Sequence, residues 1–229
     1  MATISSAYSK PGKSYIAFFD LDGTIIGANS GKALVHQAYN RGMMSFCDLA
    51  KAIYLSMVYR THLKDTRKII NDMVSWVAGL PEKSILELSS EVTANVLIPS
   101  IHSEVRSELN MHREQNARVV ILSSALKPVC QKIANHLGMD DILCSELEVV
   151  NGQYTGRPLG RLCFEEEKAL RLKEYCEVNN TEMKNAWYYA DSIDDKPALS
   201  IVGHPVCINP DKKLKKTALE RNWKILQWH

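Results

Sequence analysis

Several features that define other classes of protein are missing from this sequence of 229 residues. It has no stretch of 18 apolar residues and no apolar segment of the secretory type near its start, so neither a membrane span nor an export signal is expected. Its six cysteines are scattered, without the close pairs typical of zinc sites and redox motifs. We therefore expect a cytoplasmic protein whose cysteines are reduced and mostly packed in the core.

A strong charge of one sign is also missing. The formal net charge is +2, and no basic stripe with interleaved aromatic residues occurs, which argues against a nucleic-acid partner. Four lysines do cluster late in the chain, but Leu214 and Leu219 interrupt them at helical spacing. We interpret this cluster as the solvated face of a helix rather than a binding patch: Lys212, Lys213, Lys215 and Lys216. With 45% hydrophobic and 24% charged residues, the composition is that of an ordinary globular protein.

The most informative stretch begins with a run of apolar, β-favouring residues at 15–19. This run predicts a strand buried on both faces, and it leads directly into Asp20, Asp22 and Gly23. Extended chain places the two aspartate side chains on the same side, where they need a cation or a proton to coexist. Considered alone, the stretch is equally compatible with an acidic turn after a strand.

Two further buried strands are predicted at residues 118–122 and 186–190. Strands and helices alternate from there on, which predicts a doubly wound α/β fold with a parallel sheet. Shorter strands are expected at 142–144, 205–208 and 224–227. A small β-hairpin is expected around Asn151-Gly152, between residues 147–150 and 153–155.

A long segment after the first strand has no strand signal. Helices are predicted at residues 31–39, 45–59, 65–77 and 82–97, the first with Ser30 as N-cap, and a further helix at 101–116. We therefore predict a core domain formed by residues 1–27 and 101–229, with residues 28–100 as an inserted helical-bundle cap. Residues 1–13 are small and polar and are expected to form a loose tail.

The predicted cap helices carry large apolar side chains around most of their circumference, which is typical of a helix buried between others. One interpretation is that these side chains fill the core of the bundle. The other is that a few face the functional site and favour a bulky or apolar ligand. The residues concerned are Phe46, Ile53, Tyr54, Met57, Val58 and Trp76.

Polar side chains follow each of the three long predicted strands. The carboxyl ends of parallel strands share one edge of a sheet, so these side chains should converge there, with Lys168 at the start of an intervening helix. Carboxylate oxygens suit Mg²⁺, and a lysine and a hydroxyl beside that ion suit phosphate oxygens. Each of these residues alone has an ordinary structural interpretation, but their combination in this order points more specifically to phosphate chemistry. The residues are Asp20, Asp22, Ser123, Lys168, Asp191, Asp194 and Asp195.

The same residues, in the same order, resemble the four motifs of the haloacid dehalogenase-like (HAD) phosphohydrolases. Residues 20–24 resemble the first motif, Ser123 the second, Lys168 the third and residues 191–195 the fourth. The helical insertion resembles a cap of the C1 type. The hairpin and the segments around Gly203, Asn209 and Trp223 resemble the phosphoserine phosphatase-like subfamily IB.

This resemblance implies a Rossmann-like core and a function for each motif. Asp20 would be the nucleophile and Asp22 the general acid and base. The phosphoryl group would be held by Ser123, Lys168, Ser124, Gly23 and Thr24. Mg²⁺ would be bound by Asp20, the Asp22 carbonyl and Asp191, with Asp194 or Asp195 reaching it through water. Family members usually carry Asn at the position of Asp194, so the choice between those two stays open.

We therefore predict a Mg²⁺-dependent phosphatase that hydrolyses a phosphate monoester through an aspartyl-phosphate. The alternatives are a phosphotransferase with the same intermediate, a phosphoserine phosphatase proper and, least favoured, a non-catalytic binding module. The substrate would be a small-molecule or lipid phosphate ester, and both monomer and homodimer remain open. Phosphoserine itself is disfavoured: the resemblance calls for a Glu at Asn29 and an Arg within residues 71–78, and neither is present.

Overall fold

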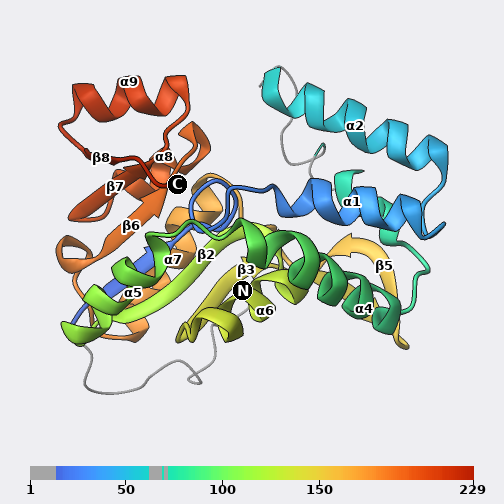
Figure 1. Ribbon diagram of the computed structural model, residues 1–229, viewed down its shortest axis with the longest axis horizontal. Helices are drawn as coiled ribbons and strands as arrows, with labels where there is room; N and C mark the ends of the chain where they lie inside the picture. Colours follow the sequence, from blue (N-terminus) through green and yellow to red (C-terminus); the bar gives the residue numbers. More distant parts are fainter. Residues whose placement is uncertain (1–13, 62–68, 70–71) are drawn as a thin grey trace.

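The computed structural model describes residue 14 to residue 61, residue 69 and residues 72–229. The predicted tail at 1–13 lies outside the described residues, as do residues 65–68, 70 and 71 of the helix predicted at 65–77. Within the part described, the centre of the molecule is a six-stranded sheet with the order β3-β2-β1-β6-β7-β8, in which every neighbouring pair is parallel (Figure 1). The doubly wound α/β fold is confirmed.

The strands lie close to their predicted positions. β1 covers Ile16–Phe19, β3 Asp141–Ser145, β6 Trp187–Ala190, β7 His204–Ile208 and β8 Lys224–Leu226. β2 differs, because it covers Arg118–Leu126 and continues past the predicted end at residue 122, with an irregular register against β3 between Leu122 and Leu126. Ser123 therefore lies inside a strand rather than after it.

Alternate residues of β1 face two separate hydrophobic cores. Ala17 and Phe19 pack in the core that contains side chains of α5 (Val105–Glu114) and α6 (Lys127–Leu137). Ile16 and Phe18 pack in the core that contains side chains of α7 (Glu166–Val178), α8 (Lys196–Leu199) and α9 (Lys212–Glu220). All four side chains of β1 are buried, so the prediction of a strand covered on both faces is confirmed.

The inserted segment is helical in its described parts, as predicted. It contains α1 (Ser30–Asn40), α2 (Phe46–Thr61), α4 (Glu82–Val92) and short turns at Ser75–Val77 and Ile98–Ser100. The predicted helix at 82–97 changes after Val92 into a π-helix, Thr93–Leu97. The helix predicted at 101–116 begins only at Val105, because Ile101 is extended and pairs with Ile26.

The prediction that the cap helices bury most of their apolar side chains is wrong for α2. Leu55 is buried and Leu49 packs against the core, but four large apolar side chains of the same helix are exposed. Their exposed fractions are 71% for Phe46, 49% for Ile53, 57% for Tyr54 and 64% for Met57. Sequence periodicity shows where apolar side chains lie around a helix, but not whether a neighbouring element covers each side.

Backbone hydrogen bonds join the helical segment to the core at the linkers and at the β-hairpin. The linkers on either side of it run antiparallel: Gly27 N donates to Ser100 O at 2.8 Å, and His102 N donates to Ile25 O at 3.1 Å. The hairpin of β4 (Leu147–Val150) and β5 (Gln153–Pro158) forms the second contact, because Tyr154 exchanges backbone hydrogen bonds with residues 79 and 80. The helical segment is therefore hydrogen-bonded to the core at both ends.

The remaining sequence expectations concern side-chain burial and membranes. The four lysines of α9 are exposed while Leu214 is buried, which confirms a solvated helix face. All six cysteines are free, and five of them are buried, with Cys47 exposed. Among the helices that the structure describes, none combines the length and apolar character that a membrane span needs.

Candidate active site

Asp20 is the first residue after the central strand, and it is held from both sides. Its backbone N–H donates to Tyr189 O of β6 at 2.9 Å, which fixes the chain at the carboxyl edge of the sheet. The side chain is 5% exposed, so its carboxylate has lost most of its contact with water. Lys168 Nζ lies 3.1 Å from Asp20 Oδ1 and provides the nearest positive charge. The positive charge of Lys168 therefore offsets part of the cost of burying this carboxylate.

Lys168 stands in the first turn of α7 and is almost fully buried. Its ammonium group also donates to Asp195 Oδ1 at 2.6 Å and to the Tyr188 hydroxyl at 3.3 Å. Burial alone would lower the pKa of Lys168, but the charges of Asp195 and Asp20 outweigh it and raise that pKa well above its ordinary value. The lysine is therefore a permanent positive charge between two carboxylates.

Asp22, two residues after Asp20, is held by the helical segment. The Ser30 N–H donates to Asp22 Oδ1 and the Ser30 hydroxyl to Asp22 Oδ2, each at 2.9 Å. Burial raises the pKa of Asp22, while the two Ser30 hydrogen bonds and the charge of Lys168 act against that rise. A carboxyl group with a raised pKa exists in both protonation states nearer to neutral pH, as a group that transfers protons requires.

Three carboxylates meet beside this pair. Oxygens of Asp20, Asp191 and Asp195 all lie within 4.8 Å of one another. Burial, with the neighbouring Asp20 and Asp195 charges, raises the pKa of Asp191 to about 8. Asp194 and the Asp22 carboxylate are not part of this cluster. Of the two candidates left open by the sequence, the structure brings Asp195 to the cluster.

The cluster fits a small divalent cation. Its ligands would be carboxylate oxygens, which Mg²⁺ prefers. Asp20 Oδ1 is buried and accepts no hydrogen bond, although Lys168 is close, so part of its capacity is unused. Crowding of the three carboxylates favours a bound cation over three free charges, as the raised pKa of Asp191 indicates.

Of the predicted phosphate-binding residues, Gly23 and Thr24 lie in the turn after β1, whereas Ser123 and Ser124 lie within β2 and Lys168 in α7. Gly23 has φ +79°, and a β-carbon there would lie 2.2 Å from Asp191 Oδ2, so this turn excludes any other residue. Thr24 is buried, and its hydroxyl makes no hydrogen bond in the structure. Ser123 is fully buried, and its Oγ accepts from Ala125 N at 3.2 Å, while Ser124 is half-buried.

Two residues of the site were not found from the sequence. Tyr188 donates to Asp195 Oδ1 at 2.5 Å, and its position two residues before the end of β6 is the signal that could have identified it. Ser30 was predicted to be the N-cap of α1, but Asn29 caps the helix by accepting from Lys32 N at 2.9 Å. Ser30 instead binds Asp22, and this contact could not be predicted without knowing where α1 lies.

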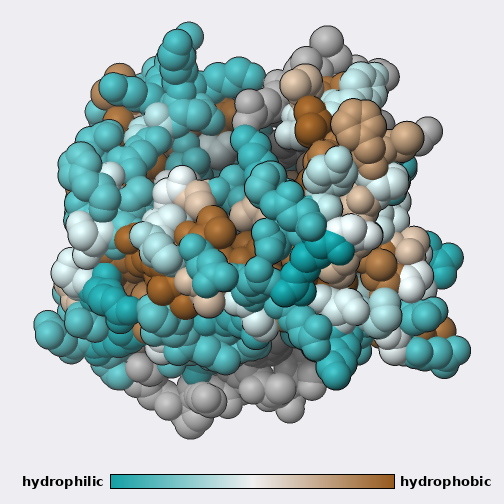
Figure 2. All heavy atoms as spheres, turned by 45° about the vertical axis from the view of Figure 1, so that its right-hand side comes forward, coloured by the Kyte–Doolittle hydropathy of each residue, from teal (hydrophilic) through white to brown (hydrophobic). Residues whose placement is uncertain are grey.

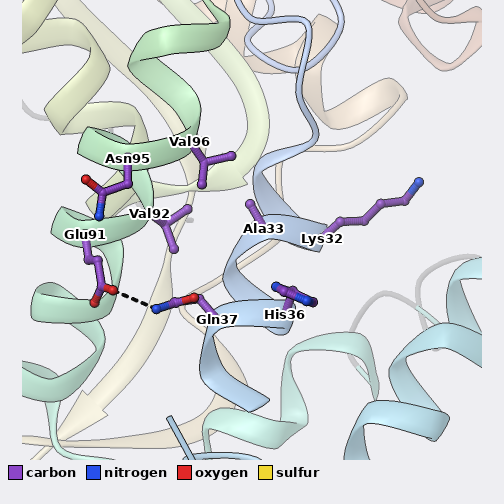
Figure 3. Close-up of a pocket in the computed structure, with 8 residues that line it drawn as sticks. All are labelled: Lys32, Ala33, His36, Gln37, Glu91, Val92, Asn95 and Val96. Atoms are coloured by element: carbon purple, nitrogen blue, oxygen red, sulfur yellow. Dashed lines mark hydrogen bonds between the residues drawn. The ribbon is translucent and has the colours of Figure 1, made fainter. Parts of the chain in front are cut away.

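A separate cavity of about 300 Å³ lies between α1 and α4 (Figure 3). Ala33, Val92 and Val96 give it an apolar wall, and Gln37 donates to Glu91 Oε1 at 2.7 Å across it. It contains none of the predicted site residues.

Known proteins with similar sequences include several phosphatases. The chain is 25% identical over 218 residues to a histidinol-phosphatase of Neisseria meningitidis, covering 93% of this chain and 98% of that protein. It is 26% identical over 218 residues to a phosphoserine phosphatase of Mycobacterium tuberculosis, covering 91% of this chain and 69% of that protein.

Solved structures show the same fold. A protein of unknown function from Bordetella pertussis superposes with a TM-score of 0.85 at 21% identity, covering 94% of this chain and 99% of that one. A phospho-aspartyl intermediate analogue of phosphoserine phosphatase superposes with a TM-score of 0.71 at 15% identity, covering 93% of each chain. Residues 17–200 match the haloacid dehalogenase-like hydrolase family. The chain therefore belongs to the haloacid dehalogenase-like hydrolases.

Proposed function

We propose that the protein is a Mg²⁺-dependent phosphatase that hydrolyses phosphate monoesters through an aspartyl-phosphate at Asp20. The observation that carries this proposal is the contact of buried Asp20 with Lys168, beside Asp191 and Asp195. A carboxylate that attacks a phosphate dianion needs positive charge around it. Lys168 provides one charge, and a divalent ion on the carboxylate cluster would shield the phosphate oxygens.

Asp22 would transfer the protons of both half-reactions. In the first half-reaction, Asp20 attacks phosphorus while the protonated Asp22 gives its proton to the leaving alkoxide. In the second, the ionised Asp22 takes a proton from the water that attacks the aspartyl-phosphate. The two hydrogen bonds from Ser30 keep the Asp22 side chain in place through both steps. Ser123, Ser124, Gly23 and Thr24 are proposed to hold the phosphoryl oxygens.

We also propose that residues 28–100 act as a cap that excludes bulk water and selects the leaving group. The antiparallel linkers at residues 25–27 and 100–102 support a boundary there, because these two crossings connect this segment to the core along the chain. Ser30 supports the same function, since it belongs to the proposed cap yet binds the catalytic Asp22. Closure of the cap and positioning of Asp22 would thus be coupled.

Activity should depend on Mg²⁺. We expect p-nitrophenyl phosphate hydrolysis to stop in excess chelator and to return when Mg²⁺ is added. Asp191→Asn should raise the Mg²⁺ concentration needed for half-maximal activity and weaken Mg²⁺ binding in calorimetry, because it removes a charged ligand. Asp194→Asn, outside the cluster, is the matched control and should change both much less. Full activity of metal-free protein would contradict the proposal.

The preferred substrate should not be phosphoserine. The Asn29 side chain, at the position where an acidic partner for the substrate ammonium group is required, caps α1 and carries no charge. A zwitterionic substrate that is buried without charged partners loses several kcal/mol of binding free energy. We therefore expect kcat/KM for phosphoserine to be lower than for aryl phosphates, lysophosphatidate or phosphatidylglycerophosphate. The reverse order in steady-state kinetics would show that the cap recognises the serine moiety in another way.

Transfer of the phosphoryl group to an acceptor other than water remains the second candidate, because it uses the same intermediate. Adding an alcohol acceptor separates the two. A hydrolase releases phosphate and alcohol product in equal amounts, whereas a transferase releases less phosphate than product. A non-catalytic binding module would show no turnover of any of these esters.

A further inference from the structure

The four exposed side chains of α2 form one continuous stripe together with Ala50. Phe46, Ala50, Ile53 and Met57 are separated by four, three and four residues, which places them on one side of the helix, and Tyr54 lies beside them. The buried Leu55 points to the opposite side. Figure 2 shows hydrophobic atoms on the part of the surface that α2 forms, and Figure 1 shows α2 at the outer edge of the helical segment.

The spacing of this stripe is that of a coiled-coil seam, in which apolar residues alternate at intervals of three and four. In an antiparallel pair of such helices, the first residue of the seam meets the last residue of the other copy. Phe46 would then face Met57 of the second copy, and Ala50 would face Ile53. Each layer combines a larger and a smaller side chain, so the stripe is complementary to itself around a two-fold axis between residues 51 and 52.

The surroundings of the stripe fit a protein partner better than a lipid surface. Helices that bind anionic membranes carry many Lys and Arg residues beside the apolar face. α2 contains two basic residues, Lys51 and Arg60, and Lys51 Nζ lies 3.3 Å from Ser75 Oγ on a neighbouring turn. Asp48, the one acidic residue there, accepts hydrogen bonds from Ser45. The stripe itself carries no charge.

The exposed area fits a weak dimer. Large aromatic side chains have areas of roughly 150–250 Å² each, so with the exposed fractions above the stripe presents about 500 Å² per copy. Two copies would bury about 1,000 Å², near the lower limit for a specific interface and typical of concentration-dependent association. An apolar patch of this size is also about the largest that a monomer normally leaves open to water.

We propose that the α2 stripe, Phe46, Ala50, Ile53, Tyr54 and Met57, is the interface of a two-fold homodimer in which α2 packs antiparallel against α2 of a second copy. The interface is formed by the helical segment and leaves the carboxylate cluster in each copy complete. It does not depend on the phosphatase proposal.

Sedimentation equilibrium of the full chain tests the proposal. From low to high micromolar concentration, the wild-type mass should rise from monomer towards dimer. Phe46→Lys alone and Met57→Glu alone should each remain monomeric, because each places a charge opposite an apolar side chain. The double variant Phe46→Lys/Met57→Glu should associate again, and high salt should weaken it, since the opposite charges then face each other.

Leu219→Glu is the matched control, because Leu219 on α9 is 64% exposed, the same fraction as Met57. It should associate like the wild type. Recovery in the double variant excludes misfolding of the single variants. A wild type that stays monomeric, or single variants that still dimerise, would overturn the proposal. Two further results would overturn it for a wild type that does not self-associate. Binding of the wild type, but not of Met57→Glu, to phosphatidylglycerol vesicles would assign the stripe to lipid. A raised KM for aryl phosphates in the single variants would assign it to substrate.

Discussion

Asp20→Asn should abolish turnover and leave the fold intact. The amide keeps the shape of the carboxylate, but it cannot attack phosphorus to form an acyl phosphate. Phosphate release from p-nitrophenyl phosphate should fall to the background of the assay. Denatured protein quenched during turnover should retain phosphate in the wild type and none in the variant, as mass spectrometry of the peptide that contains residue 20 would show.

The fold of this variant should be no less stable than that of the wild type in the absence of Mg²⁺. Asp20 is one of three crowded carboxylates, and neutralising it removes repulsion from Asp191 while giving up the contact with Lys168. Thermal melting with and without Mg²⁺ provides the control, because the metal should stabilise the variant less than the wild type. Retention of more than a few per cent of wild-type activity, with contamination excluded, would assign the nucleophile elsewhere.

The convergence of Asp20 and Asp191 could be predicted from the sequence because it follows from topology. Both residues come directly after buried strands, and parallel neighbours end at the same edge of a sheet. The register agrees, since Phe19 pairs with Tyr189 and places Asp20 one residue before the level of Asp191. Gly23 could be predicted as part of a tight turn, although its closeness to Asp191 could not.

Contacts between the helical segment and the core could not be predicted in the same way. Asn29 and Ser30 are both good N-cap residues, and their order at the start of α1 does not decide which of them caps it. The structure decides, because Asn29 is the last residue in extended conformation and Ser30 faces Asp22. The exposure of the α2 stripe could not be predicted for a related reason. The sequence shows that α2 is apolar on several sides, but not which of these sides packs against a neighbouring element.

The fourth motif gives a third example of a contact that the sequence could not predict. Asp194 and Asp195 are adjacent and chemically identical, so the sequence left open which of them joins the cluster. The short helical turn Ile193–Asp195 directs Asp195 inward, where Lys168 and Tyr188 bind it, and leaves Asp194 half-buried. Which of the two aspartates points into the cluster depends on the direction of this one turn, and the residue types alone do not determine that direction.

Asp22→Asn should reduce turnover of alkyl phosphates by roughly 10²–10⁴-fold, the usual contribution of one acid–base group. The loss should depend on the leaving group. An alkoxide needs a proton as it leaves, whereas p-nitrophenolate is stable without one. With p-nitrophenyl phosphate, the variant should therefore form the aspartyl-phosphate at a rate close to wild type and then hydrolyse it slowly, because the attacking water has lost its base.

Rapid-quench measurements should show this difference as a burst of nitrophenolate, equal to the enzyme concentration, followed by a slow steady rate. Ser30→Ala is the matched control: it removes one of the two hydrogen bonds to Asp22 and keeps the carboxyl group. It should slow both half-reactions moderately, without a burst, and it should shift the pH dependence of kcat. Equal losses for alkyl and nitrophenyl esters in Asp22→Asn would show that Asp22 maintains the geometry of the site and does not transfer protons.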